Sequence, residues 1–107
     1  MPFFIMTCRH HVGTAEMREA NRASHRRWVD TGGDGLVSVL IGSAIVDDQQ
    51  HNVGHFGILE AESQANALAF AEGDAFFTAG IVASVEIIPL ASKFQADRIT
   101  QPMSPRL

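Results

Sequence analysis

Four short apolar runs and two helix-like segments follow one another along the chain in an order that few folds accommodate. The runs are rich in β-branched and aromatic residues, which is typical of buried strands. They are residues 2–8, 36–41, 56–61 and 81–90. Helix-forming segments separate the first run from the second and the third from the fourth. The order β-α-β-β-α-β predicts a ferredoxin-like α+β sandwich, in which a four-stranded antiparallel sheet carries two helices on one face.

Capping residues delimit the two helices. Thr14 can cap a helix over residues 15–30, which contain no glycine or proline, and a Gly-Gly pair follows that segment. Ser63 can cap a second helix of about ten residues, which Gly73 ends. Residues 43–54 are mostly polar, and we expect them to form a loop.

The length of 107 residues is that of one domain. We expect the domain to occupy residues 1–90. Residues 91–107 contain Pro102 and Pro105, and we expect them to form an extended tail.

Both faces of the predicted sheet are apolar. In the first run, Phe4, Met6 and Cys8 alternate with Phe3, Ile5 and Thr7. The second and fourth runs show the same two-sided pattern, yet two helices can cover only one face. An uncovered apolar face of several hundred Å² is too large for a typical monomer. The pattern favours a homodimer that packs sheet against sheet, and the alternative is that the tail folds back over the face.

Composition excludes several classes of function. The formal net charge of −4 argues against nucleic-acid binding. The single cysteine, Cys8, allows no internal disulfide, so the cytoplasm is the expected compartment. The N-terminal apolar run ends at Arg9, and no later run is long enough to span a membrane, so we expect neither export nor membrane insertion.

The histidines do not form a recognisable metal motif. His10 and His11 are adjacent on a strand and would point to opposite faces. His51 and His55 have a helical spacing, but Asn52 and Gly54 make a helix there improbable. Zinc usually needs three or four convergent ligands. We therefore expect no metal site, and we interpret these four histidines as solvated loop residues.

His25 differs from the other histidines because it lies in the middle of the first predicted helix. Arg22 and Trp28, three residues before and after it, share its face. On the residues alone, His25 can be a packing residue or a reactive one. Asp74 can likewise be a simple turn residue, and so can the pair Gly42-Ser43 after the second run.

Several motifs in order resemble the YCII-related (YciI-like) family of small proteins. The strongest stretch begins at Gly-Ile-Leu-Glu-Ala-Glu-Ser, residues 57–63, and continues as Gly-Asp-Ala-Phe-Phe-Thr-Ala-Gly-Ile, residues 73–81. It closes with Val-Glu-Ile-Ile-Pro-Leu, residues 85–90. The family's Arg-Pro-x-His element is matched by Arg-Ala-Ser-His at 22–25, its glycine turn by Gly42-Ser43, and its Asp-Pro-Phe element by Asp-Ala-Phe at 74–76.

The resemblance implies a ferredoxin-like fold that dimerises through its sheet, in the manner of a dimeric α/β-barrel. It also implies an active-site cleft with a His25–Asp74 dyad and no cofactor. At least one group in the family has been assigned an elimination or dehydrochlorination on a muconolactone-type substrate. Both family prolines are alanine in this chain, at Ala23 and Ala75.

A histidine–aspartate pair suits proton transfer at neutral pH. The hypothesis is that His25 abstracts a proton next to a carbonyl of a small carboxylated or lactone substrate, which leads to isomerisation or elimination. The expected substrate-binding residues are Arg22, Gly42, Ser43 and Trp28. Arg22 could hold a carboxylate and Ser43 could stabilise a developing oxyanion.

Two alternatives stay open. One is a non-catalytic dimer that binds a small molecule or a partner protein. The other is a cofactor-free monooxygenase of the dimeric α/β-barrel type, which shares this fold.

Overall fold

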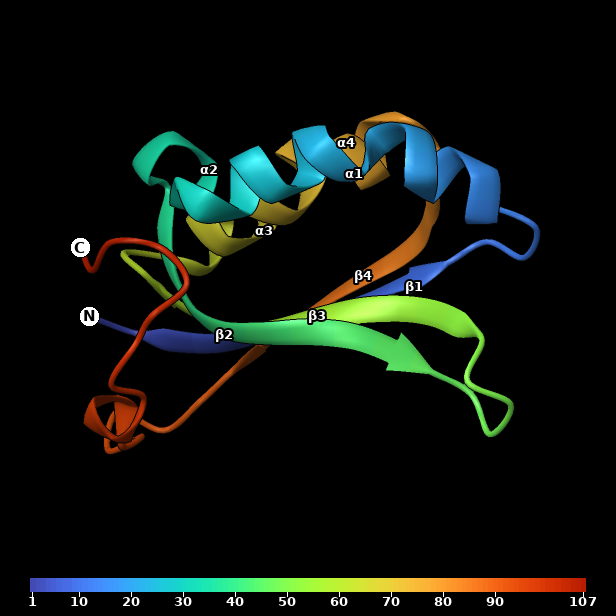
Figure 1. Ribbon diagram of the computed structural model, residues 1–107. Helices are drawn as coiled ribbons and strands as arrows, with labels where there is room; N and C mark the ends of the chain where they lie inside the picture. Colours follow the sequence, from blue (N-terminus) through green and yellow to red (C-terminus); the bar gives the residue numbers. More distant parts are fainter.

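A computed structural model describes all residues, 1–107. It confirms the predicted α+β sandwich: a four-stranded antiparallel sheet has the strand order β2-β3-β1-β4. The strands are β1 (Phe3–His10), β2 (Val37–Val46), β3 (Asn52–Ala61) and β4 (Val82–Pro89). Figure 1 shows every α-helix on one side of this sheet.

The two long helices lie where the capping residues predict them. They are α1 (Ala15–Asp30) and α3 (Gln64–Gly73), and Ser63 accepts the first backbone N–H bond of α3 as a cap. The sequence did not predict two single turns. One is α2 (Gly32–Gly35), whose four residues all have positive φ and so wind left-handed, and the other is the short helix α4 (Ala75–Thr78). The short α4 matters for the site because Asp74 caps it.

The prediction of a loop at residues 43–54 is wrong. Strands β2 and β3 continue through most of this segment and form a long hairpin, with a turn that runs from Asp47 to His51. The side chain of Asp47 accepts bonds from the backbone N–H groups of Gln49 and His51, which fixes the turn. The polar residues of this segment therefore belong to strands at an exposed end of the sheet and not to a long loop.

The main core lies between the sheet and the helices. It contains the alternating residues Phe4, Met6 and Cys8 of β1 together with Phe70, Phe76 and Ile81. Trp28 packs against this core, and its indole Nε1 donates a hydrogen bond to the carbonyl oxygen of Phe70.

The tail after β4 folds over part of the opposite face of the sheet. Figure 1 shows it turning under the sheet, on the side away from the helices, and then rising along the β2 edge. It includes a 3-10 turn, η1 (Ala96–Arg98), and Ala96 is buried with Phe3 and Leu40 in a second apolar cluster. The alternative in which the tail covers the second face is thus realised at one end of the sheet.

The rest of that face exposes a row of isoleucines. Strand register aligns Ile41, Ile58, Ile5 and Ile88 across β2, β3, β1 and β4. Ile41 and Ile88 are among the large apolar side chains that remain exposed. The outer isoleucine row is therefore only partly covered by the tail.

Candidate functional site

His25 and Asp74 meet between α1 and α4. Nδ1 of His25 lies 2.8 Å from both carboxylate oxygens of Asp74. Gly73 ends α3 and Asp74 adopts extended backbone angles, so the carboxylate turns back to accept the N–H of Phe76. The predicted pairing of these two side chains, 49 residues apart in sequence, is present.

The ring of His25 is fixed by its bond to Asp74 and by stacking on one face. It stacks on Phe76 with ring centroids 4.1 Å apart and planes 1° from parallel. Since Nδ1 bonds to the carboxylate, the ring carries its Nδ1 proton toward Asp74. Nε2 makes no hydrogen bond within the chain and is free to contact a ligand.

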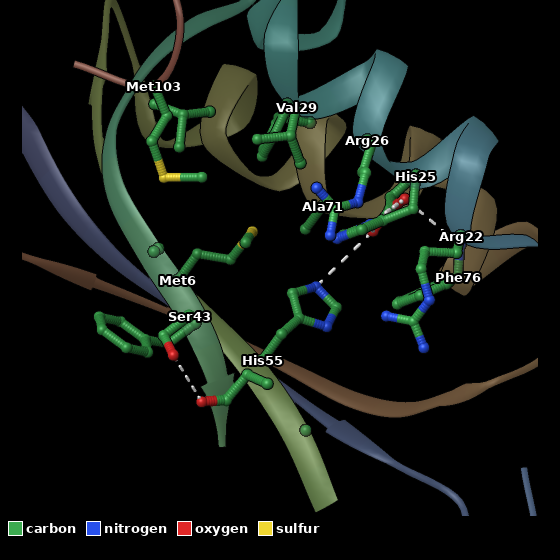
Figure 2. Close-up of a pocket in the computed structure, with 18 of the residues that line it drawn as sticks. Met6, Arg22, His25, Arg26, Val29, Ser43, His55, Ala71, Phe76 and Met103 are labelled. Carbon is green, nitrogen blue, oxygen red and sulfur yellow. Dashed lines mark hydrogen bonds and ion pairs between the residues drawn. The ribbon is translucent and has the colours of Figure 1, made fainter. Parts of the chain in front are cut away.

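A cavity of about 300 Å³ opens beside this pair, between the helix layer and the sheet. Its lining includes His25 and Asp74 together with apolar residues from the sheet, the helices and the tail, among them Met6, Val29, Phe70, Phe76 and Met103. Figure 2 shows Met6, Val29, Phe76 and Met103 around the space, with His25 on the helix side and His55 on the sheet side. The volume is at the lower end of the range for small-molecule sites.

Two arginines of α1 extend to the cavity (Figure 2). Arg22, the predicted anion-binding residue, lines the cavity and also pairs with Glu19 at 3.1 Å. Arg26 was not predicted, although it follows Arg22 by one helical turn and so shares its face. It forms no ion pair or side-chain hydrogen bond, so it is the guanidinium that is free to take an anionic group.

Gly42 and Ser43 line the cavity, but they do not form the expected turn. Both lie inside β2, opposite Gly57 and Phe56 of β3. The hydroxyl of Ser43 donates to the carbonyl oxygen of Ala44, and strand alternation places Ser43 and His55 on opposite faces of the sheet. This orientation does not support the expected role of Ser43 as an oxyanion donor.

Trp28 is absent from the cavity lining. Its ring packs over Gly33 and Gly73, where an added Cβ would approach to within 2.8 and 2.5 Å of Trp28 atoms. Trp28 is therefore a packing residue that fits α1 against α2 and α3.

The interpretation of His10 and His55 as solvated loop residues is wrong. His10 is the last residue of β1, and His55 is a buried residue of β3. Nε2 of His10 lies 2.8 Å from Nδ1 of His55, and Nε2 of His55 faces Asp74 Oδ2 at 3.6 Å. The period-two series His55, Gly57, Leu59 and Ala61 was the signal that could have placed His55 on the inner face.

Burial lowers the pKa of His10 and of His55 to about 4, and the Arg18 guanidinium adds to the effect on His10. The nearby Asp74 carboxylate opposes the shift at both rings, but burial outweighs it. Both rings are therefore neutral at physiological pH.

Cys8 lies next to this cluster, paired with His55 in the β1–β3 register. Burial, with a smaller contribution from Asp74, raises the pKa of its thiol to about 12. The thiol stays protonated at neutral pH and is not a nucleophile.

No group of three or more His, Cys, Asp or Glu side chains has an arrangement that could hold a metal ion. No helix is both long and apolar enough to cross a membrane.

The fold and the cavity together define a class: ferredoxin-like α+β sandwiches with a small cavity between the helices and the sheet. Within that class, the chain belongs to the YCII-related domain family, whose model matches residues 2–91.

A solved structure shows the same fold. The 5-chloro-2-hydroxyhydroquinone dehydrochlorinase of Burkholderia phenoliruptrix, in complex with 2,5-dihydroxybenzoquinone, superposes with a TM-score of 0.70. Its sequence is 23% identical, over 83% of this chain and 93% of that chain. A candidate antibiotic biosynthesis monooxygenase of Bacteroides thetaiotaomicron has a TM-score of 0.49 at 14% identity, over 87% of this chain and 90% of that chain. No protein of curated function matches the sequence of this chain.

Proposed function

We propose that the chain is an enzyme that removes a proton from a small ring substrate, with His25 as the general base and Asp74 as the residue that orients it. The observation that carries the proposal is the free Nε2 of His25 at the edge of the cavity, on a ring whose Nδ1 is bonded to a buried carboxylate. A base that is oriented in this way contributes about 10²–10⁴ in rate.

The substrate class follows from the lining. The cavity has room for about one ring, and Phe76 and Val29 offer apolar contact. Arg22 and Arg26 can pair with a carboxylate or an ionised ring oxygen at the helix side. The substrate is a small cyclic anion with an acidic proton next to a carbonyl.

The proton step is balanced without a cofactor. Nε2 of His25 takes the proton, and the electron pair of the broken bond moves into the ring toward the carbonyl oxygen. A leaving group such as chloride then departs with an electron pair, or the proton returns at another carbon. The first course is an elimination and the second an isomerisation. The dehydrochlorinase named above, which acts on a chlorinated hydroxyhydroquinone, supports the choice of the first course.

Chloride release tests this function. The protein is mixed with 5-chloro-2-hydroxyhydroquinone and with chlorinated lactones, and free chloride is measured against time. We expect wild-type protein to release chloride from at least one of them and His25→Gln to lose this activity by 10²-fold or more. His51→Gln, an exposed position in the hairpin turn, is the matched control and should retain it. Equal chloride release by wild type and His25→Gln would contradict the proposal.

Binding without turnover is the second candidate, and the orientation of Ser43 favours it, because the site then lacks the hydroxyl expected to stabilise an oxyanion. The same compounds distinguish the two. A thermal shift with 2,5-dihydroxybenzoquinone, with no product from any chlorinated compound, would indicate a binding module.

The outer isoleucine row supports a homodimer. This row crosses all four strands, and the tail covers only the end of the face near Phe3 and Leu40. A second copy of the sheet would remove the exposed Ile41 and Ile88 from water. This part of the proposal is independent of the chemistry.

A further inference from the structure

A row of buried polar side chains runs from α1 to Asp74 beneath the cavity. Nη1 of Arg18 lies 3.4 Å from Nδ1 of His10, and Nε2 of His10 lies 2.8 Å from Nδ1 of His55. Nε2 of His55 then faces Oδ2 of Asp74 at 3.6 Å. Figure 2 shows His55 reaching up from the sheet toward the helix layer, and the Asp74 carboxylate that it faces is the one that His25 also contacts.

Arg18 at one end of the row and Asp74 at the other determine which nitrogen of each ring donates a hydrogen bond. A guanidinium can only donate, so Nδ1 of His10 is an acceptor and the proton of the neutral ring is on Nε2. That proton makes Nδ1 of His55 an acceptor in turn, so the proton of the neutral His55 is on Nε2, which faces a carboxylate oxygen. Each donor thus has an acceptor ahead of it, from Arg18 to Asp74.

Arg18 is unusual because it is buried and has no acidic partner. It is only 9% exposed and takes part in none of the ion pairs of the chain. Its other contact is the hydroxyl of Thr14, at 2.8 Å, and that hydroxyl donates to the carbonyl oxygen of His11. Thr14 therefore holds the guanidinium against His10 instead of capping α1 with its side chain.

The groups that face the two rings are few. They are Arg18 from α1, Asp74 before α4, His25 from α1, and the protonated thiol of Cys8 beside His55. One carboxylate is thus shared by two histidines, His25 and His55. If His55 became an imidazolium, it would neutralise Asp74 and weaken the hold of that carboxylate on His25.

We propose that Arg18 and His10 are positioning residues that orient the neutral His55 with its Nε2 proton toward Asp74, so that the charge of Asp74 is reserved for His25. The functional consequence rests on the proposed role of His25 as the base. Arg18 cannot accept a proton, so the row ends there and is not a path for protons to solvent.

Ring tautomers test the proposal without any substrate. Long-range ¹H–¹⁵N correlation spectra of the uniformly ¹⁵N-labelled protein at pH 7.5 distinguish protonated from bare imidazole nitrogens. We expect the proton on Nε2 in His10 and His55 and on Nδ1 in His25. A proton on Nδ1 of His10 or of His55 would mean that this ring donates its hydrogen bond in the opposite direction, and it would overturn the proposal. These spectra require no turnover. They therefore test the orientation of His10 and His55 separately from the proposal that His25 is the general base.

Two substitutions at one position separate charge from packing. Arg18→Met keeps the aliphatic stem but removes the charge, and Arg18→Lys keeps the charge. In a titration from pH 7.5 to about 3, which passes through the wild-type midpoint, we expect the midpoint of the His10–His55 pair to rise in Arg18→Met and to stay near the wild-type value in Arg18→Lys. An unchanged midpoint in Arg18→Met, or the same rise in both variants, would contradict the role given to Arg18. The wild-type tautomers test the direction of the row even where Arg18→Met fails to fold.

Discussion

Asp74 brings together three neighbours that lie far apart or on different elements. Its carboxylate accepts from Nδ1 of His25 and from the backbone N–H of Phe76, and it faces Nε2 of His55. It is only 5% exposed, so its charge acts in a medium that screens it weakly. Any change of charge at this residue should therefore reach the base, the cap of α4 and the histidine row at once.

Replacing Asp74 by Asn separates charge from shape. Asn is as good a cap as Asp, so we expect α4 and the fold to persist. The imidazolium that forms when His25 takes a proton loses its counter-charge, so turnover should fall by about 10²–10⁴-fold. Chloride release measures the loss, and far-UV circular dichroism checks the fold. Retained activity in a folded Asp74→Asn protein would argue against the dyad.

The half-buried His10 and the buried His55 make stability depend on pH. Their pKa in the folded protein is about 4, below the value of about 6.5 in an unfolded chain. Between these values the unfolded chain binds more protons, so the free energy of unfolding falls as pH decreases from 6.5 toward 4. The expected slope approaches about 1.4 kcal/mol per pH unit for the buried His55 and is smaller for the half-buried His10.

Urea unfolding at pH 7 and pH 5 measures this slope. A His10→Gln, His55→Gln double variant should lose most of it. The exposed His11→Gln variant is the matched control and should keep it. A wild-type protein whose stability is the same at both pH values would show that the two rings are not held neutral.

Among the elements, the tail is the one that joins the two faces of the sheet. It starts on the outer face with Ala96 and ends at the β2 edge, where the buried Ser104 hydroxyl accepts the backbone N–H of Val39 at 2.7 Å. Arg106 then pairs with Glu60 of β3 through two bonds of 2.7 and 2.9 Å. Through Met103, the same segment supplies one wall of the cavity.

Ser104→Ala tests how firmly the tail is held. The substitution leaves the N–H of Val39 without its partner in a buried position, which costs about 1–3 kcal/mol. We expect a lower urea midpoint and faster proteolysis of the tail. Ser92→Ala, at an exposed position earlier in the tail, should change neither. An unchanged midpoint in Ser104→Ala would mean that the tail is not part of the folded unit.

The contact between α1 and α3 depends on the absence of side chains beneath Trp28. An alanine Cβ at Gly73 would lie 2.5 Å from the Trp28 ring, which is closer than atoms can pack. Gly73→Ala should therefore destabilise the protein by about 1–3 kcal/mol. The control is Ala69→Ser, on the exposed side of α3. Gly80→Ala would not serve as a control, because Gly80 has a positive φ that alanine rarely adopts. Thermal unfolding compares the two variants.

At the scale of the whole molecule, the proposed homodimer would pack through the outer isoleucine row. We expect light scattering after gel filtration to give about twice the chain mass of 11.6 kDa. Ile88→Glu places a charge in the row and should yield a monomer, because a buried unpaired charge is costly. Val12→Glu, in the exposed turn before α1, is the control and should remain a dimer. A wild-type monomer at micromolar concentration would contradict the dimer.

The sequence predicted the long helices almost to the residue because their caps are local signals. Ser63 and the glycines after α1 act within one turn of the chain. It misjudged the β2–β3 hairpin because polar residues such as Asn52 and His55 are typical of loops unless one knows which face of a sheet they meet. The short α4 was missed for a similar reason: one turn capped by Asp74 has too few residues for a periodic pattern.

For the site, pairing of His25 with Asp74 was predicted through the family resemblance and not through spacing. Arg26 could have been found, since it follows Arg22 at helical spacing. The sequence could not have predicted that His10 and Met103 belong to the site. It could not have predicted the positions of Ser43 and Trp28 either. Their roles depend on strand register, on the path of the tail and on the packing of one ring over two glycines.

The sequence by itself determined the order of the elements, their hydrophobic faces and the ends of the long helices, because these follow from contacts between near neighbours along the chain. Only the tertiary structure decided which polar side chains share a carboxylate. Residues 10, 18, 25, 55 and 74 come from four separate parts of the chain, and their mutual distances are set by how the helices cross the sheet.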